Sequence, residues 1–332
     1  MISKILKKNT DCNKKRKCRN HSLYDYVYPA IQQSEDDANN IRNYKNWNKV
    51  EFDGCRLPGT QEPRESCGEF KTIGCCNAEE HKRKGHGDTT YVNRFKSSCK
   101  SPHCKECVPQ WIAREAIRAT KRFEKFAKTT PNKAIHVILS PSREDHVLLE
   151  KKLHKKANKI LKEVNLKGGA LIFHPWRLIK EKLELFEYPH FHFIGFGWLR
   201  NLKLVAARYG WRVIYKGKRK TILGTFTYLL SHAGVKKGRH SVTWVGEMSY
   251  GKLKIDKRPN VGKCPACGRK LVPIYYVGKH PPVPPDKPFE GFVDAEGWYE
   301  VKTLDFDNKS DYKFEYDSRK ETNEILKGLA IS

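Results

Sequence analysis

Residues 187–198 read EYPHFHFIGFGW, an apolar stretch that carries two histidines one residue apart. On a β-strand alternate side chains share a face, so His190 and His192 point the same way. Phe191 and Phe193 then face the core. A buried strand tolerates imidazoles only when they have partners, and two of them can bind one divalent cation while leaving coordination positions open for a substrate oxygen. The alternative is a pair of structural histidines satisfied within the core.

A third histidine lies on the preceding apolar segment, GALIFHPWR, which spans residues 169–177 and is expected to form a strand. If this strand pairs antiparallel with the next one, His174 lies across from the histidine pair. We therefore expect His174 to be the third metal ligand. The alternative is a polar histidine at a strand end.

The segment TILGTFTYLLSHAG, residues 221–234, has the spacing of a helix that ends at Gly234. Tyr228 lies opposite its apolar face, in a stripe of small and polar residues that suits a cleft. His232, one turn later, reaches the same volume and could orient a phosphate, act on a proton or complete the metal site. The alternative is a half-exposed tyrosine hydrogen-bonded to solvent. The apolar face comprises Ile222, Phe226, Leu229 and Leu230, and the polar stripe Gly224, Thr225, Ser231 and His232.

Apolar strands and amphipathic helices follow one another in an irregular order along the chain. This order predicts an α+β domain in which helices pack on a central, mainly antiparallel sheet, and it does not fit a doubly wound parallel fold. The expected helices span 111–128, from Ser142 to a stop at Gly168 and Gly169, and 221–234; the expected strands span 133–142, 169–177, 189–199 and 211–216. The apolar face of the second helix comprises Leu149, Leu153, Ala157, Ile160 and Val164.

The net charge indicates which class of partner the protein binds. With 65 Lys and Arg against 37 Asp and Glu, the net charge is +28, which suits a polyanion. No apolar run approaches the ~20 residues of a membrane span, so we expect a soluble, cytoplasmic protein without membrane contact and with nucleic acid as its polyanion. Residues 286–332 carry 7 Lys and Arg against 12 Asp and Glu, so the basic surface belongs to the preceding residues. The sequence contains no GxxxxGK[ST] motif and hence no P-loop helicase.

Eleven cysteines, most of them clustered, favour metal-bound thiolates over disulfides. Cys99, Cys104 and Cys107 form a C-x4-C-x2-C knuckle just before the first expected helix. We expect Cys76 to complete a structural Zn²⁺ site with them. The alternates for the fourth ligand are Cys67 and Cys75.

A second pair of cysteines lies near the C-terminal end, in KCPACGRK. Cys264 and Cys267 have the spacing of half a zinc site, and two further ligands are needed to complete it. His240, His280 or upstream residues are the candidates. The alternative is a turn that binds no metal.

Composition divides the chain into five parts. Residues 1–50 are polar and expected to be mobile, and residues 51–110 hold seven of the eleven cysteines and are expected to depend on zinc. Residues 111–262 form the α+β domain. A CxxC element at 263–280 and a proline-rich linker with an acidic tail at 281–332 complete the chain.

Three segments, in this order, resemble motifs of the HUH endonucleases, and more closely those of rolling-circle replication initiators (Rep proteins) of plasmids and single-stranded DNA viruses. KAIHVILSPS stands where that family has its first strand, PHFHFIGFG resembles its metal-binding motif, and TFTYLLSHAG resembles the motif of its nucleophilic tyrosine. The resemblance covers residues 111–250. The Tyr-Leu-Leu-Ser-His form and the cysteine-rich front are similar to initiators of archaeal plasmids and viruses. Where some members have a second tyrosine this chain has His232, which implies a single-tyrosine enzyme.

The resemblance implies that Mn²⁺ or Mg²⁺ on His190 and His192 polarises the scissile phosphate of single-stranded origin DNA. Tyr228 would attack that phosphate and become joined to the 5′ side, which leaves a 3′-OH to prime a polymerase. The host helicase and polymerase would be further partners, in a cell that carries the plasmid or virus. Two alternatives remain: a zinc-containing nucleic-acid-binding protein without chemistry, and a transposase of the same superfamily.

Overall fold

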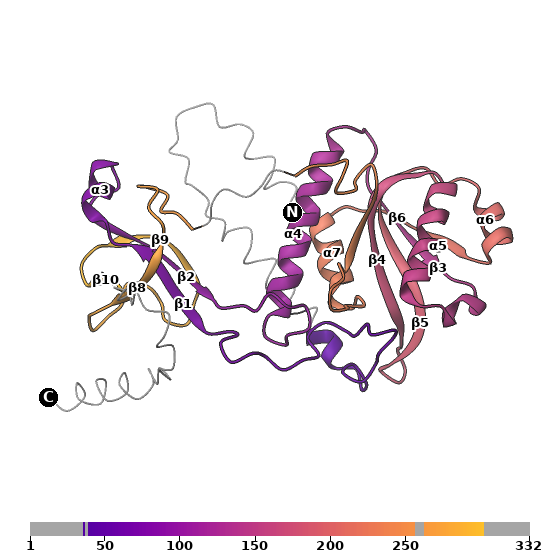
Figure 1. Ribbon diagram of the computed structural model, residues 1–332, viewed down its shortest axis with the longest axis horizontal. Coiled ribbons are helices and arrows are strands. Elements are labelled where there is room, and N and C mark those ends of the chain that lie inside the picture. The colour runs from indigo at the N-terminus through magenta and orange to yellow at the C-terminus, as the bar shows by residue number, and fades with distance from the viewer. Residues whose placement is uncertain (1–35, 37–38, 256–261, 302–332) are drawn as a thin grey trace, which may run out of the picture.

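The computed structural model of the 332-residue chain describes residue 36, residues 39–255 and residues 262–301. These residues form two antiparallel five-stranded sheets and several helices, which confirms the predicted α+β class with mainly antiparallel strands. Helix α4 (Val108–Ala127) lies between the two sheets and packs on the larger one (Figure 1). No helix among the described residues is both long and apolar enough to cross a bilayer.

The larger sheet has the strand order β6-β3-β5-β4-β7, and all neighbouring strands are antiparallel. Helices α4 and α7 cover one face and helices α5 and α6 the other, so the sheet lies between two hydrophobic cores. Its elements after α4 are β3 (Ile135–Ser140), α5 (Glu150–Glu163), β4 (Leu166–Ile179), β5 (Glu184–Gly197), α6 (Leu202–Tyr209), β6 (Arg212–Lys218), α7 (Ile222–Ser231) and β7 (Val242–Gly246).

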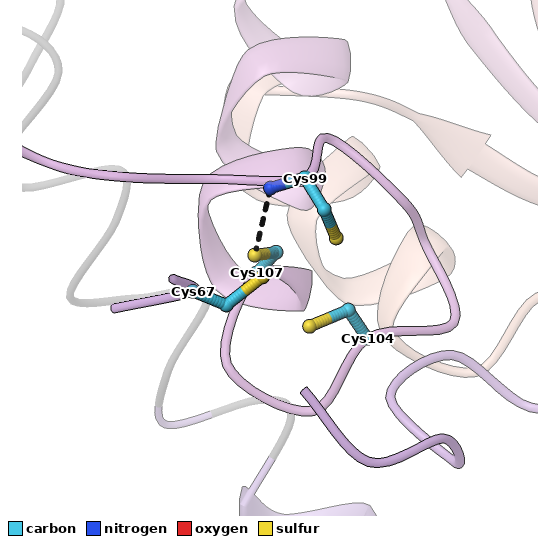
Figure 2. A group of neighbouring side chains, drawn as sticks. All are labelled: Cys67, Cys99, Cys104 and Cys107. Atoms are coloured by element: carbon cyan, nitrogen blue, oxygen red, sulfur yellow. Dashed lines mark hydrogen bonds between the residues drawn. The ribbon is translucent and has the colours of Figure 1, made fainter. Parts of the chain in front are cut away.

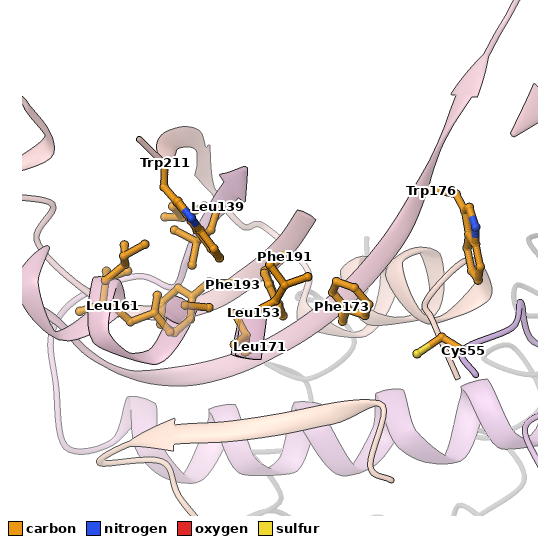
Figure 3. Packing of buried hydrophobic residues seen from close by; sticks show 14 of the residues in the cluster. Cys55, Leu139, Leu153, Leu161, Leu171, Phe173, Trp176, Phe191, Phe193 and Trp211 are labelled. Atoms are coloured by element: carbon orange, nitrogen blue, oxygen red, sulfur yellow. The ribbon is translucent and has the colours of Figure 1, made fainter. Parts of the chain in front are cut away.

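Alternation along β5 decides which side chains enter which core. Phe191 and Phe193 are fully buried on the α5 side, where Trp211 also packs (Figure 3). Ile194, from the opposite face, packs with residues of α4 and α7. His190 and His192 share the face of Ile194, as the strand periodicity predicts.

The helix expected to begin at Ser142 begins later. Residues Arg143–Val147 form a 3₁₀ turn, η1, and α5 starts only at Glu150. The buried carboxylate of Asp145 accepts hydrogen bonds from Trp211 Nε1 at 2.6 Å and from Lys156 Nζ at 2.6 Å, which stabilises the separate turn. Leu149, expected on the apolar face, is exposed because it precedes the helix, whereas the other four residues of that face are buried.

The expected stop at Gly168 and Gly169 is also wrong, because both glycines lie within β4. Helix α5 ends at Glu163, and Asn165 takes a left-handed conformation with φ 64°. A Cβ at Gly169 would collide with the carbonyl oxygen of Ile194, so this glycine permits the close approach of β4 and β5. Helix α7 ends at Ser231 rather than at Gly234, and α6 and β7 were not predicted.

The smaller sheet combines strands from both ends of the described chain, in the order β10-β8-β1-β2-β9. This differs from the predicted division of the chain, because β8 and β9 are hydrogen-bonded to β1 and β2 of the cysteine-rich region. Val283, inside the proline run, is buried in this unit, so the run connects two of its strands. The elements are β1 (Phe70–Cys75), α3 (Ala78–Arg83), β2 (Thr89–Lys96), β8 (Val272–Tyr276), β9 (Phe289–Asp294) and β10 (Trp298–Glu300).

Most of the segment expected to be mobile, 1–50, lies outside the described residues, as do residues 302–332 of the expected acidic tail. Residues 39–50 are described, and for them the prediction is wrong because they pack on the larger sheet. Ile41 is buried in its core. The Asn46 side chain donates to the Leu185 carbonyl at 2.8 Å and accepts from the Leu185 N–H at 2.9 Å.

Candidate functional site

Three histidines meet on the face of the larger sheet that α7 covers. His190 and His192 come from β5, and His174 lies opposite His190 in the register of β4. All three are buried, and each offers a ring nitrogen within 4.8 Å of the nitrogens of the other two. The ring centroids of His174 and His192 are 4.3 Å apart. The structure thus brings together the three histidines that were predicted to be metal ligands.

The hydrogen bonds of these imidazoles fit a cation. His190 Nδ1 donates to the Tyr188 carbonyl at 2.8 Å, and His192 Nδ1 lies 2.7 Å from His136 Nε2, so each ring keeps its Nε2 for another partner. Neither ring nitrogen of His174 makes a hydrogen bond of normal geometry within the described part of the chain, although both are buried and the Leu229 backbone is near. Imidazole ligands of metals commonly have their second nitrogen held in this way, and an orphaned buried nitrogen is costly without a partner. The donor set suits Zn²⁺, Mn²⁺ or Fe²⁺.

Burial keeps these histidines neutral. It lowers the pKa of His190 to about 3 and that of His136 to about 4. The pKa values of His174 and His192 lie well below the ordinary range, mainly through burial and further through the neighbouring histidines. At neutral pH the rings therefore present lone pairs, which is the form that binds a metal.

Tyr228 projects from α7 beside this cluster. Its apolar neighbours on the helix anchor it as predicted: Phe226, Leu229 and Leu230 are buried against α4 and the sheet, while Tyr228 itself is 59% exposed. The Tyr228 ring lies 4.6 Å from that of His232, which in turn lies 4.5 Å from that of His174, measured between centroids. The phenol and the three imidazoles thus lie on the same side of the sheet.

His232 connects Tyr228 to the three histidines, but it is not among those whose ligand atoms lie within 4.8 Å of one another. Its pKa is lowered to about 4 by burial, so it is a neutral base at pH 7. The N–H of Gly234 donates to the Phe173 carbonyl at 2.8 Å, which fixes the end of α7 against β4 next to His174.

Three residues near the site were not predicted. His136 on β3 contacts His192, as described above. Arg177 on β4 lies over the Tyr188 ring at 4.0 Å and donates to Ser140 Oγ at 3.2 Å, and its charge helps to lower the pKa of His190. Burial raises the pKa of Tyr44, and the charge of the neighbouring Tyr228 phenolate would raise it further. No local pattern marks these residues, since each comes from a different segment and acts only through tertiary contact.

Four cysteines form a group at the start of α4, with their sulfurs directed toward a common centre (Figure 2). Cys99, Cys104 and Cys107 are members as predicted, and the Cys99 N–H donates to Cys107 Sγ at 3.4 Å. The fourth member is Cys67 rather than Cys76. Cys76 follows β1 directly and packs in the core with β8 and β9, on the opposite side from Cys75, because successive residues of a strand point to opposite faces. This group could hold a metal such as zinc.

A second group forms on the smaller sheet, where Cys75, His81, Cys264 and Cys267 meet. The CxxC pair is thus completed by upstream residues, while His240 and His280 are exposed and take no part. This group could also hold a metal.

Comparisons with protein-family models, with curated proteins and with solved structures found no match to this chain.

Proposed function

We propose that this chain is a metal-dependent, single-strand DNA nicking and joining enzyme of the HUH type that initiates rolling-circle replication. The proposal depends on the position of Tyr228. This residue is exposed on a helix whose apolar face is buried in the core. The ring of His232 contacts both the Tyr228 ring and the ring of His174, a member of the cluster of three buried, neutral imidazoles. A nucleophile within reach of a metal site is the arrangement that phosphoryl transfer through a covalent intermediate needs.

In the proposed step the Tyr228 phenolic oxygen forms a bond to phosphorus while the bond from phosphorus to the 3′ oxygen breaks. A free phenol has a pKa of about 10 and is a weak nucleophile, so its proton must leave during attack. We assign its acceptance to His232, whose ring centroid lies 4.6 Å from that of Tyr228, and the departing 3′ oxygen takes a proton from water. The phosphotyrosine retains the energy of the cleaved bond, so the reverse step can rejoin the strand, and the released 3′-OH can prime a host polymerase.

In the proposal the three histidines hold a divalent cation through their unprotonated nitrogens, and of the two expected ions Mn²⁺ fits this donor set better than Mg²⁺, which prefers oxygen ligands. Such a cation supplies Lewis-acid stabilisation of the phosphate charge that develops in the transition state. Arg177, whose charge acts on His190, adds positive potential at the same edge of the site. The net charge of +28 supports DNA as the partner. We also propose that the Cys67, Cys99, Cys104 and Cys107 group holds a structural Zn²⁺ beside α4.

A second candidate is a zinc-containing nucleic-acid-binding protein without chemistry, in which the histidines are structural. The two cysteine groups favour it as much as they favour the enzyme. The exposed Tyr228 beside the histidine cluster has no role in this alternative.

The two candidates differ in whether a covalent adduct forms. The full-length protein is incubated with Mn²⁺ and a pool of randomised single-stranded DNA, and denaturing gels and mass spectrometry detect protein-bound DNA. We expect an adduct at Tyr228 that disappears in Tyr228→Phe and persists in Tyr215→Phe, a matched control because Tyr215 is 50% exposed on β6. An adduct that survives in Tyr228→Phe would refute the assigned nucleophile, and DNA binding without any adduct would favour the second candidate.

A further inference from the structure

We propose that Cys75, His81, Cys264 and Cys267 bind a structural Zn²⁺ that joins the two distant segments of the smaller sheet. The ligand atoms of the four residues lie within 4.8 Å of one another. Cys264 Sγ is 3.2 Å from His81 Nε2, and Cys75 Sγ is 3.6 Å from Cys267 Sγ. Three thiolates and one imidazole at such distances are a standard tetrahedral zinc set.

The surroundings hold each ligand in position. His81 Nδ1 donates to the Thr89 carbonyl at 2.6 Å, which places the proton on Nδ1 and leaves the Nε2 lone pair directed at the sulfurs. His81 is fully buried on α3, and its ring meets the ring of Phe292 edge-on at 5.5 Å between centroids. A buried, oriented imidazole beside three thiols is difficult to explain as packing alone.

The CxxC segment has the turn that zinc-binding cysteine pairs use. The Cys264 N–H donates to the Arg269 carbonyl at 2.7 Å, and the Gly268 N–H donates to the Cys264 carbonyl at 2.9 Å. Gly268 adopts φ 75°, a left-handed conformation that suits glycine. The turn presents both sulfurs to the same side, where β1 delivers Cys75.

The apolar core around these ligands is small. Its buried members are Cys75, Tyr91, Cys264 and Leu271, so half of them are cysteines. So small an apolar cluster contributes little burial energy, and a metal would supply the cohesion that it lacks. Because residues 75–81 and 264–267 are far apart in the sequence, the metal would hold β8, β9 and β10 to the β1–β2 hairpin.

The test measures metal content and does not depend on nicking. Zinc per chain is determined in the purified full-length protein, in the double variant Cys264→Ser with Cys267→Ser, and in Cys76→Ser, a control next to Cys75 but outside both cysteine groups. We expect the double variant to lose one equivalent of zinc and the control to lose none. An unchanged zinc content in the double variant would overturn the proposal.

A second variant, His81→Cys, distinguishes the loss of a ligand from misfolding, because it replaces one metal-binding side chain by another. In cobalt-substituted protein, His81→Cys should keep the metal and shift the cobalt d–d absorption from a three-sulfur, one-nitrogen pattern toward a four-sulfur pattern. An unshifted spectrum would show that His81 is not a ligand. In the native wild-type protein, an alkylating reagent should leave Cys264 and Cys267 unmodified until a chelator removes the zinc. Alkylation of either cysteine without chelator would overturn the zinc site. So would a mass two hydrogens lower than expected, because that indicates a disulfide.

Discussion

Replacement of His136 by Gln should reduce the acid sensitivity of folding. His136 is buried on β3, and burial, with help from Arg219 and Lys216, lowers its pKa to about 4. In the unfolded chain an ordinary histidine has a pKa near 6.5. The unfolded state therefore binds a proton between pH 6.5 and about 4 that the folded state does not, and the free energy of unfolding falls as the pH is lowered through this window.

The size of the effect follows from these two pKa values. At pH 5, a group with a folded pKa of about 4 and an unfolded pKa near 6.5 destabilises the folded state by about 2 kcal/mol relative to pH 7. His190, with a folded pKa of about 3, adds about 2 kcal/mol more in the wild type. Since whole domains are stable by only about 5–15 kcal/mol, these two residues account for a large share of any acid lability. A cation on the imidazoles would lower the folded pKa values further, so the sign is the same with or without metal.

Urea unfolding followed by tryptophan fluorescence at pH 7 and pH 5 tests this reasoning. The drop in the free energy of unfolding between the two pH values should be about 2 kcal/mol smaller in His136→Gln than in the wild type. His280→Gln is the control, because His280 is exposed and its replacement should leave the drop unchanged. An equal drop in His136→Gln and in the wild type would refute the claim that His136 is buried in its neutral form.

Gly195 on β5 and Cys67 in the first cysteine group give two further predictions. Gly195→Ala should destabilise the protein by about 1–3 kcal/mol in urea unfolding, because the added Cβ would collide with the Gly168 carbonyl oxygen of β4 and with the ring of Phe193. Gly251→Ala is the control and should leave the stability unchanged, because nothing lies within 4 Å of the added Cβ. Cys67→Ser should lose one equivalent of zinc in elemental analysis while Cys76→Ser retains it, and the opposite result would restore Cys76 as the ligand.

The sequence predicts those features that depend on local periodicity. Alternation along β5 is enough to place the phenylalanines in one core and the histidines on the other face, and the helical spacing around Tyr228 is enough to separate it from the buried leucines. To predict which face His174 lies on, one further assumption was needed, namely that its strand pairs antiparallel with the next one. The observed register agrees, since His174 lies opposite His190. The predicted helix start at Ser142 is wrong, because helical periodicity cannot reveal that the Asp145 carboxylate accepts a hydrogen bond from Trp211 in a separate turn.

Features that join distant segments were not predictable in this way. The smaller sheet pairs β1 and β2 with strands that follow almost two hundred residues later, and those strands lie in sequence that is rich in proline and acidic residues. Cysteine spacing alone could not distinguish Cys67 from Cys76, since both lie upstream of the knuckle at plausible distances. Tertiary structure separates them: Cys67 meets the knuckle cysteines, whereas Cys76, directly after β1, packs in the core of the smaller sheet.

One strand, β4, positions both halves of the proposed catalytic site. It carries His174, and the carbonyl of the residue before His174 receives the N–H of Gly234 at the end of the segment that follows α7. A Cβ at Gly234 would lie 2.8 Å from the Pro175 ring, so the lack of a side chain there is what allows this close contact. Because His174 and the segment that follows the helix of Tyr228 are fixed to the same stretch of β4, the separation of Tyr228 from the proposed metal ligands does not depend on a flexible loop. If the proposed function is right, residues outside the candidate site, Gly234 and Pro175 among them, determine whether the phenol and the imidazoles can act on one phosphate.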